Sequence, residues 1–186
     1  FTFNGKKYTP QSYAKELGLN ADDYVSLTSF THHPFYSKFA LEIEDNWRWA
    51  ESYNLPIDEL MRTMEYAIDK GYTIAWGSDV SEKGFTRDGI AVLADVEEIE
   101  TKGSDQARWI GLNYSDKQRL LTQLIHSANV PEINPTQEYR QKGFDNYELT
   151  DDHGMVIYGI AKNQLGRKFF MVKNSWGEAG VYKGIW

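Results

Sequence analysis

Residues 152–177 read DHGMVIYGIAKNQLGRKFFMVKNSWG, and this stretch determines how the rest of the chain is interpreted. His153–Ala161 and Lys168–Asn174 are rich in β-branched and aromatic residues, which favour strands. Residues 162–167 between them (KNQLGR) have the composition of a turn. The stretch therefore predicts an antiparallel hairpin.

The hairpin places one histidine and one asparagine together. A turn centred between Asn163 and Gln164 pairs residues whose numbers sum to 327, so His153 faces Asn174. Facing side chains in such a ladder have Cβ atoms about 4.5–5.5 Å apart, within hydrogen-bonding reach. A slip of one residue would move the two side chains to opposite faces, so this prediction depends on the register.

An imidazole beside a carboxamide is suited to activating a thiol. The imidazole takes the thiol proton and holds the thiolate as an ion pair, and the thiolate can then attack a peptide carbonyl. The Asn side chain accepts a hydrogen bond from the other ring nitrogen and fixes the tautomer. Trp176 can cover this bond and exclude water, which strengthens it.

Each part of this pattern also has an ordinary structural interpretation. A histidine at a strand end usually has a structural role, and Asn-Ser-x-Gly, as at Asn174–Gly177, usually forms a turn. The combination with Trp176 on facing strands favours the catalytic interpretation of His153 and Asn174.

The composition limits what the chain can do. None of its 186 residues is a cysteine, so it holds no thiol nucleophile, disulfide or thiolate metal site. Hydrophobic residues make up 41% and aromatic residues 15%, as expected for a folded domain or a large part of one. The net charge of -7 provides no broad basic surface for nucleic acid. No apolar run approaches the roughly 18 residues of a membrane span.

The remaining segments predict a mixture of helices and strands. In the clearest helix the apolar residues recur at a spacing of 3.6, and Met61 and Met64 are expected to fill the core. A capping-box pattern starts at Ser115. The expected elements are a hairpin and helix within Phe1–Gly18, strands at Tyr24–Phe30, Phe39–Ile43 and Tyr72–Gly77, and helices at Pro56–Lys70 and from Ser115 onward.

Two other groups of residues are weighed as metal sites and set aside. His32 and His33 are adjacent, and adjacent side chains of a strand point to opposite sides, so an irregular loop at 31–35 is favoured over a site. The acidic run Asp95–Glu100 is interpreted as an exposed strand or loop. His126 is interpreted as a partly exposed residue near a helix end.

The strings at 153–155 (HGM) and 174–177 (NSWG) resemble the His and Asn boxes of papain-like cysteine peptidases. Their form is similar to the bleomycin hydrolase and aminopeptidase C branch. Softer similarity to that branch extends through 52–58, 77–80 and 144–153, so that the resemblance covers most of the chain.

The resemblance implies an α+β, papain-like fold, of which residues 1–186 are the β-rich C-terminal half, with an antiparallel sheet plus helices. It implies that His153 is the catalytic imidazole and Asn174 its orienting partner, and that Asp152, Gly154 and Trp176 contact the substrate. The family's Cys box and oxyanion-hole Gln are not found here, so they are expected in an upstream half of the same protein.

For the whole protein, the resemblance implies a peptide substrate, no cofactor, no metal and no membrane or nucleic-acid partner. It also implies a cytoplasmic homo-oligomer, namely a hexamer, and an exported protein is the alternative that stays open for the location. The leading hypothesis is part of a cysteine aminopeptidase. The alternative is a degenerate, non-catalytic peptidase fold that acts as a binding or regulatory module.

Overall fold

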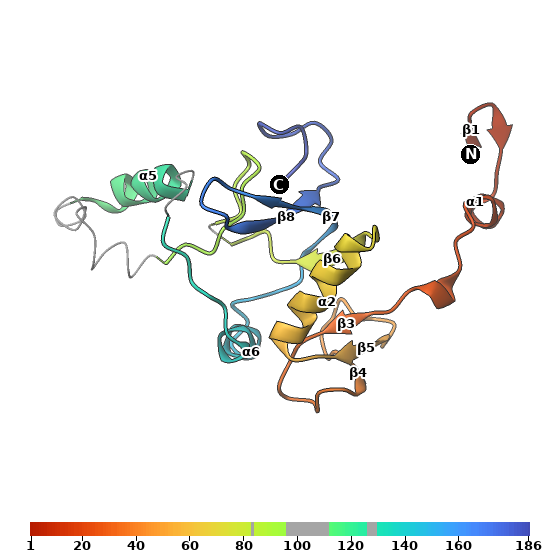
Figure 1. Ribbon diagram of the computed structural model, residues 1–186, viewed down its shortest axis with the longest axis horizontal. Coiled ribbons are helices and arrows are strands. Elements are labelled where there is room, and N and C mark those ends of the chain that lie inside the picture. Colours follow the sequence, from red (N-terminus) through yellow and green to blue (C-terminus); the bar gives the residue numbers. More distant parts are fainter. Residues whose placement is uncertain (83, 96–111, 126–129) are drawn as a thin grey trace. The chain divides into compact units, whose positions relative to one another are not determined.

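The computed structural model describes residues 1–82, 84–95, 112–125 and 130–186 (Figure 1). The chain divides into two compact units, Phe1–Pro56 and Ile57–Trp186, each with its own elements. In the described residues no helix is long and apolar enough to cross a bilayer.

The first unit opens with the predicted hairpin and helix. Strands β1 (Thr2–Phe3) and β2 (Lys6–Lys7) pair antiparallel, and α1 (Pro10–Glu16) follows. Thr9 caps α1 through a reciprocal pair of hydrogen bonds with Ser12, at 3.1 and 2.9 Å. A short 3-10 helix, η1 (Ala21–Asp23), comes next.

A three-stranded sheet completes this unit, in the order β3-β5-β4. Its strands are β3 (Leu27–Thr28), β4 (Lys38–Ala40) and β5 (Glu51–Asn54). β5 runs parallel to β3 and antiparallel to β4. The first two strands are shorter than the sequence predicted, and β5 was missed because Glu, Ser and Asn are weak strand formers.

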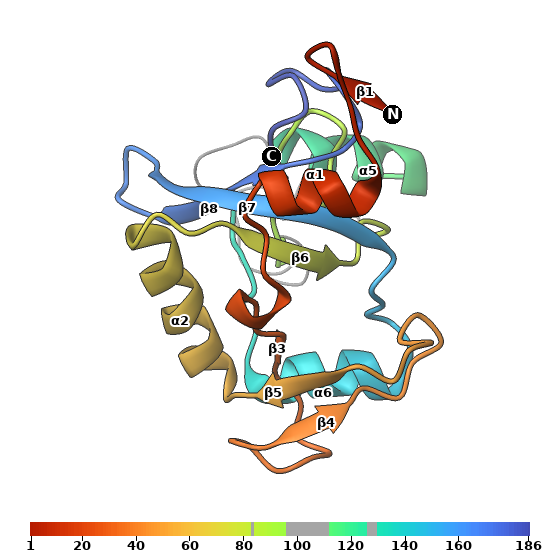
Figure 2. The ribbon, with the colours of Figure 1, turned by 90° about the vertical axis from the view of Figure 1, so that its right-hand side faces the viewer.

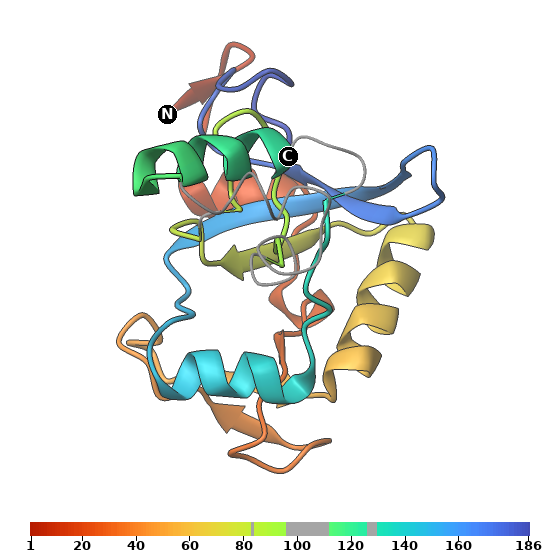
Figure 3. The same ribbon diagram turned by 90° about the vertical axis from the view of Figure 1, so that its left-hand side faces the viewer.

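The second unit is built on an antiparallel sheet of order β6-β7-β8 (Figures 2 and 3). Its strands are β6 (Ile74–Ser78), β7 (His153–Lys162) and β8 (Lys168–Lys173). The hairpin of β7 and β8 is thus the predicted one.

Helix α2 (Ile57–Asp69) packs beside this sheet, and one apolar stripe of the helix is partly buried there. Met64 and Ile68 contact a core of four buried residues, namely Met155, Ile157, Val172 and Trp186. Met61 is 42% exposed, so the prediction that both methionines fill the core is wrong for Met61.

Two further helices of the second unit lie within the described residues. α5 (Tyr114–Ile125) begins earlier than predicted, because the residue that caps it is Asn113 and not Ser115. Asn113 Oδ1 accepts a hydrogen bond from the Asp116 N–H at 2.9 Å. α6 (Gln137–Asp145) was not predicted, since its sequence is polar and only Gln141 and Gly143 are buried. Ile125 and Val130 form a smaller core cluster.

The register of the β7–β8 hairpin differs from the predicted one. Near the turn, pairs such as Lys162 with Lys168 sum to 330, so the turn is centred on Leu165. Farther from it, Val156 pairs with Lys173, and the sum is 329. The change occurs between Ile157 and Gly159, which makes Tyr158 the extra residue of a β-bulge. The expected sum of 327 is therefore wrong by two at the open end.

Two glycines that face each other in the β6–β7 ladder give a matched test of packing. A Cβ at Gly77 would lie 2.4 Å from Asp151 Oδ1, whereas a Cβ at Gly154 would have nothing within 4 Å. We expect Gly77→Ala to lower the free energy of unfolding by about 1 kcal/mol, because the exposed Asp151 carboxylate must turn away from the new methyl group. Gly154→Ala should change it by less than about 0.5 kcal/mol. Urea denaturation of both variants checks this, and equal losses would contradict it.

Candidate active site

The predicted pair of side chains meets at the open end of the hairpin. His153 Nε2 lies 2.8 Å from Asn174 Oδ1, within the range of a good hydrogen bond. His153 begins β7 opposite Ser78 of β6, and Asn174 directly follows β8. The imidazole is half-buried and the asparagine is 2% exposed.

A second hydrogen bond fixes the tautomer of His153. The backbone N–H of Ser175 donates to Asn174 Oδ1 at 2.7 Å, which identifies this atom as the side-chain oxygen. An oxygen acceptor requires that Nε2 of His153 donates. In the neutral ring, Nδ1 then carries no proton and can accept one.

Trp176 lies against the same imidazole. Its ring centroid is 5.0 Å from that of His153, with 38° between the planes. Edge contacts with Phe85 and Trp186, at 6.0 and 5.6 Å, hold the indole in place. Trp176 is still 42% exposed, so one part covers the ring while another part faces solvent.

The other two predicted residues flank His153 along the chain. Asp152 Oδ1 accepts a hydrogen bond from the Val80 N–H at 3.1 Å, and the Asp152 N–H donates to Ser78 O at 3.1 Å. Gly154 is exposed, with open space where a side chain would begin. Asp152 thus ties β7 to the end of β6, and the open space at Gly154 lies on the opposite face of β7 from the imidazole.

Asp79 has a positioning role that the sequence did not assign. Its carboxylate accepts bonds from Ser81 N–H and Oγ–H, at 2.8 and 2.6 Å, and from Thr150 N–H and Oγ1–H, at 3.0 and 3.3 Å. These bonds connect the segment after β6 to the segment that leads into His153. Residues 77–80 belong to the softer similarity to the bleomycin hydrolase branch, and this signal could have pointed to Asp79.

Two buried donors beside His153 have no hydrogen-bond partner among the residues that the structure describes. They are Asn174 Nδ2 and Ser78 Oγ. Leaving such a group unpaired costs about 1–3 kcal/mol, so each one calls for an explanation such as a catalytic role or a bound water or ion. Both donors belong to residues that contact or face His153.

The structure also locates the groups that were set aside as metal sites. His32 and His33 lie in a loop, as predicted, but the argument that their rings diverge is wrong, because both contact Glu42. Asp95 is the one described residue of the acidic run, and His126 lies outside the described residues.

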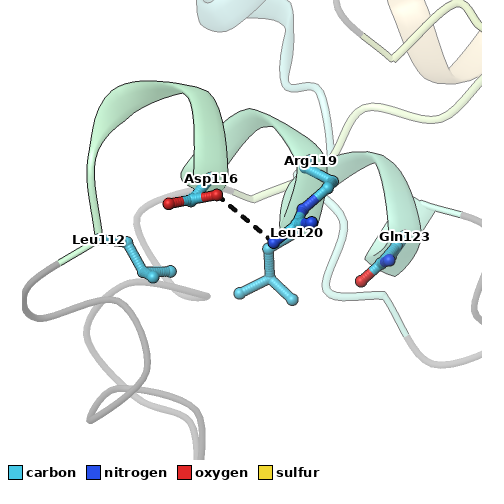
Figure 4. A pocket seen from close by; sticks show the side chains of 5 residues that line it. All are labelled: Leu112, Asp116, Arg119, Leu120 and Gln123. Atoms are coloured by element: carbon cyan, nitrogen blue, oxygen red, sulfur yellow. Dashed lines mark hydrogen bonds and ion pairs between the residues drawn. The ribbon is translucent and has the colours of Figure 1, made fainter.

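A hollow on α5 is a weaker candidate site (Figure 4). Asp116 and Arg119 form an ion pair in it, at 3.4 Å. It is lined by Leu112, Asp116, Arg119, Leu120 and Gln123. All five come from one helix and the residues just before it, so no second element brings a polar group to converge on this hollow among those that line it.

Comparisons with known proteins agree with the sequence resemblance. No family model matches the chain. Aminopeptidase G of Lactobacillus delbrueckii subsp. lactis is 23% identical over 189 residues, covering 97% of this chain and 35% of that protein. The crystal structure of PepW from Lactobacillus rhamnosis is similar with a TM-score of 0.59 and 21% identity, again covering 97% of this chain and 35% of the other.

These likenesses extend over nearly the whole chain, and they confirm the resemblance to aminopeptidases that was expected from residues 152–177. They also support an α+β, peptidase-like fold for this chain. The chain spans about a third of the length of the curated relative that it matches.

The hydrogen bonds at Asp79 predict a dependence of stability on pH. Burial raises the pKa of the Asp79 carboxyl, but the bonds from Ser81 and Thr150 outweigh it and hold that pKa below its ordinary value. The stabilisation is therefore complete above the unfolded pKa of about 3.9 and is lost as the pH falls through the lower folded value.

We expect Asp79→Asn to lower the free energy of unfolding by about 1 kcal/mol at pH 7, and by much less near pH 2. Urea denaturation at both pH values measures the difference. Asp45→Asn, at an exposed position in a turn outside the helices, is the control and should show a much smaller pH-dependent difference. If Asp79→Asn lowered the free energy of unfolding equally at both pH values, the proposed stabilisation by the Asp79 carboxylate would be ruled out.

Proposed function

We propose that this chain is the His- and Asn-bearing part of a papain-like cysteine aminopeptidase, whose nucleophilic cysteine lies outside these 186 residues. The observation that carries the proposal is the bond from His153 Nε2 to Asn174 Oδ1, with Trp176 against the ring. The likeness to Aminopeptidase G supports a peptide substrate.

In this proposal, His153 acts as the general base and then as the general acid. Nδ1 takes the proton of the cysteine thiol, and the thiolate sulfur forms a bond to the carbonyl carbon of the scissile peptide. The tetrahedral intermediate collapses, the C–N bond breaks, and the proton on Nδ1 passes to the leaving amine. Water then hydrolyses the thioester: Nδ1 accepts its proton and returns it to the thiolate. Proton transfers of this kind contribute about 10²- to 10⁴-fold to the rate.

Asn174 is the positioning residue in this scheme. Its neutral oxygen fixes the proton on Nε2 and adds no charge that would hold a second proton on the ring. In this scheme Trp176 shields the bond from water on one side, and its exposed part contacts the substrate.

Asp152 and Gly154 complete the proposed substrate-contacting set. In this proposal an extended peptide contacts their backbone, which flanks the imidazole along the chain. The further partners are the upstream half that carries the cysteine and other copies of the whole protein, with a cytoplasmic hexamer as the form that the resemblance favours. No cofactor takes part in the scheme.

The second candidate function is a non-catalytic binding or regulatory module. The observation in its favour is that the chain contains no cysteine. The two candidates differ in one feature of the complete protein, namely a cysteine positioned to reach Nδ1 of His153.

The isolated 186-residue chain should hydrolyse no aminoacyl substrate, because it has no thiol. The complete protein should hydrolyse aminoacyl-p-nitroanilides, and iodoacetamide should abolish this activity by alkylating a cysteine outside the chain. Chromogenic assays of both proteins measure this. Turnover by the isolated chain, or full activity of the complete protein after alkylation, would overturn the proposal.

In the complete protein, Asn174→Ala should lower kcat about 10- to 10³-fold with little change in KM, because the imidazole loses its orientation and not its contact with substrate. Asn146→Ala is the matched control, since Asn146 is exposed and bonds only locally to the Glu148 N–H. It should leave kcat within twofold. Steady-state kinetics measure kcat and KM for both variants. An unchanged kcat in Asn174→Ala would show that Asn174 has no role in the mechanism.

A further inference from the structure

Three metal-ligating side chains converge in the first unit. His33 Nε2 lies 2.7 Å from Glu42 Oε1, and His32 Nε2 lies 3.3 Å from Glu42 Oε2. The three donor atoms that these residues offer all lie within 4.8 Å of one another. In the described residues this is the one group of three or more His, Cys, Asp or Glu side chains close enough to share an ion.

The loop that carries the histidines is fixed by a fully buried side chain. Asn54 Nδ2 donates to the carbonyl oxygens of Phe30 and His33, at 2.8 and 3.0 Å. Its Oδ1 accepts from the Phe30 N–H at 2.9 Å. Asn54, the last residue of β5, thus fixes the backbone at His33. The loop departs from the extended geometry that would separate adjacent side chains.

Aromatic packing fixes the rings themselves. The His33 ring stacks on Phe39 of β4 with centroids 4.1 Å apart and 20° between the planes. The His32 ring meets the same phenyl group edge-on at 5.6 Å, and the two imidazoles are 4.8 Å apart. Phe39 is buried, so both imidazoles rest on a rigid support before any ligand arrives.

We propose that His32, His33 and Glu42 form a binding site for a divalent first-row transition metal ion, best represented by zinc. The ion is coordinated by the two Nε2 atoms and the Glu42 carboxylate. Neutral imidazole and carboxylate are ordinary zinc ligands, and water completes the coordination.

The spacing of the donor atoms fits such an ion. With bonds of about 2.0–2.1 Å, a tetrahedral site separates its ligand atoms by about 3.3–3.4 Å. The His32–Glu42 separation of 3.3 Å already has this value. The 2.7 Å bond between His33 and Glu42 must open by less than an ångström.

The charge of Glu42 and the solvent exposure of the three side chains also suit a metal ion. A hydrogen bond from His33 holds the pKa of the Glu42 carboxyl below its ordinary value, so the carboxylate is ionised at neutral pH. The side chains of His32, His33 and Glu42 are 29%, 31% and 47% exposed, so an ion can enter from solvent. Binding requires each Nε2 to carry a lone pair, so its proton moves to Nδ1 or is released to solvent.

Zinc affinity of the intact protein, measured by competition with a chromophoric chelator, tests the proposal. We expect one zinc per chain, with the affinity reduced at least about tenfold in His33→Ala and in Glu42→Gln. Glu44→Gln, which changes an exposed carboxylate two residues away, and His153→Ala, which removes another histidine, should retain full affinity. Circular dichroism checks that each variant is folded.

A measurement on the unaltered protein covers the case in which a variant does not fold. Cobalt(II) bound at this site should show the visible absorption of a four-coordinate ion, and X-ray absorption at the zinc edge should show two imidazoles per ion. Several outcomes would overturn the proposal. They are the absence of stoichiometric binding, equal affinity in Glu42→Gln and Glu44→Gln, or loss of the ion in His153→Ala. Absence of binding would leave the three residues as a metal-free pairing of two imidazoles with one carboxylate.

Discussion

The candidate site depends on a single extra residue in strand β7. Near the turn, the ladder pairs residues whose numbers sum to 330, and that register continued to the open end would place His153 and Asn174 on opposite faces. The bulge at Tyr158 changes the sum to 329 and reverses the alternation. His153 and Asn174 then share a face as diagonal neighbours, a distance that long side chains span. The observed 2.8 Å bond is the consequence.

The supports around this pair are electrostatic on one side and aromatic on the other. Asp79 and Asp152 each accept hydrogen bonds across the β6–β7 junction, so the start of β7 is held at two points. Trp176 is positioned by Phe85 and Trp186, and Trp186 anchors itself by donating from Nε1 to Thr86 O at 2.6 Å. The general base that we propose at His153 would need to keep its orientation through a reaction cycle, and rigid neighbours would provide this.

The sequence predicted the hairpin and the His153–Asn174 contact because strand composition and box spacing are local signals. The predicted register was wrong, but the predicted contact was still correct. The sums 327 and 329 are both odd, so either register places the two side chains on the same face. Bulges have no reliable composition signal, so Tyr158 could not be placed. β5 and α6 were missed for a related reason. Their polar sequences are stabilised by tertiary bonds, such as those of Asn54, that no periodicity reveals.

The unsatisfied groups argue for function independently of any likeness to known proteins. Asn174 Nδ2 and Ser78 Oγ are buried and unpaired within the described part of the chain, and both lie next to His153. A sheet selected for stability alone would pair or replace them, because each costs about 1–3 kcal/mol. Among the described histidines, His153 is the one whose tautomer is fixed by two hydrogen bonds at a common oxygen. The unpaired groups beside it therefore support the proposal of a site that is kept for chemistry at some cost in stability.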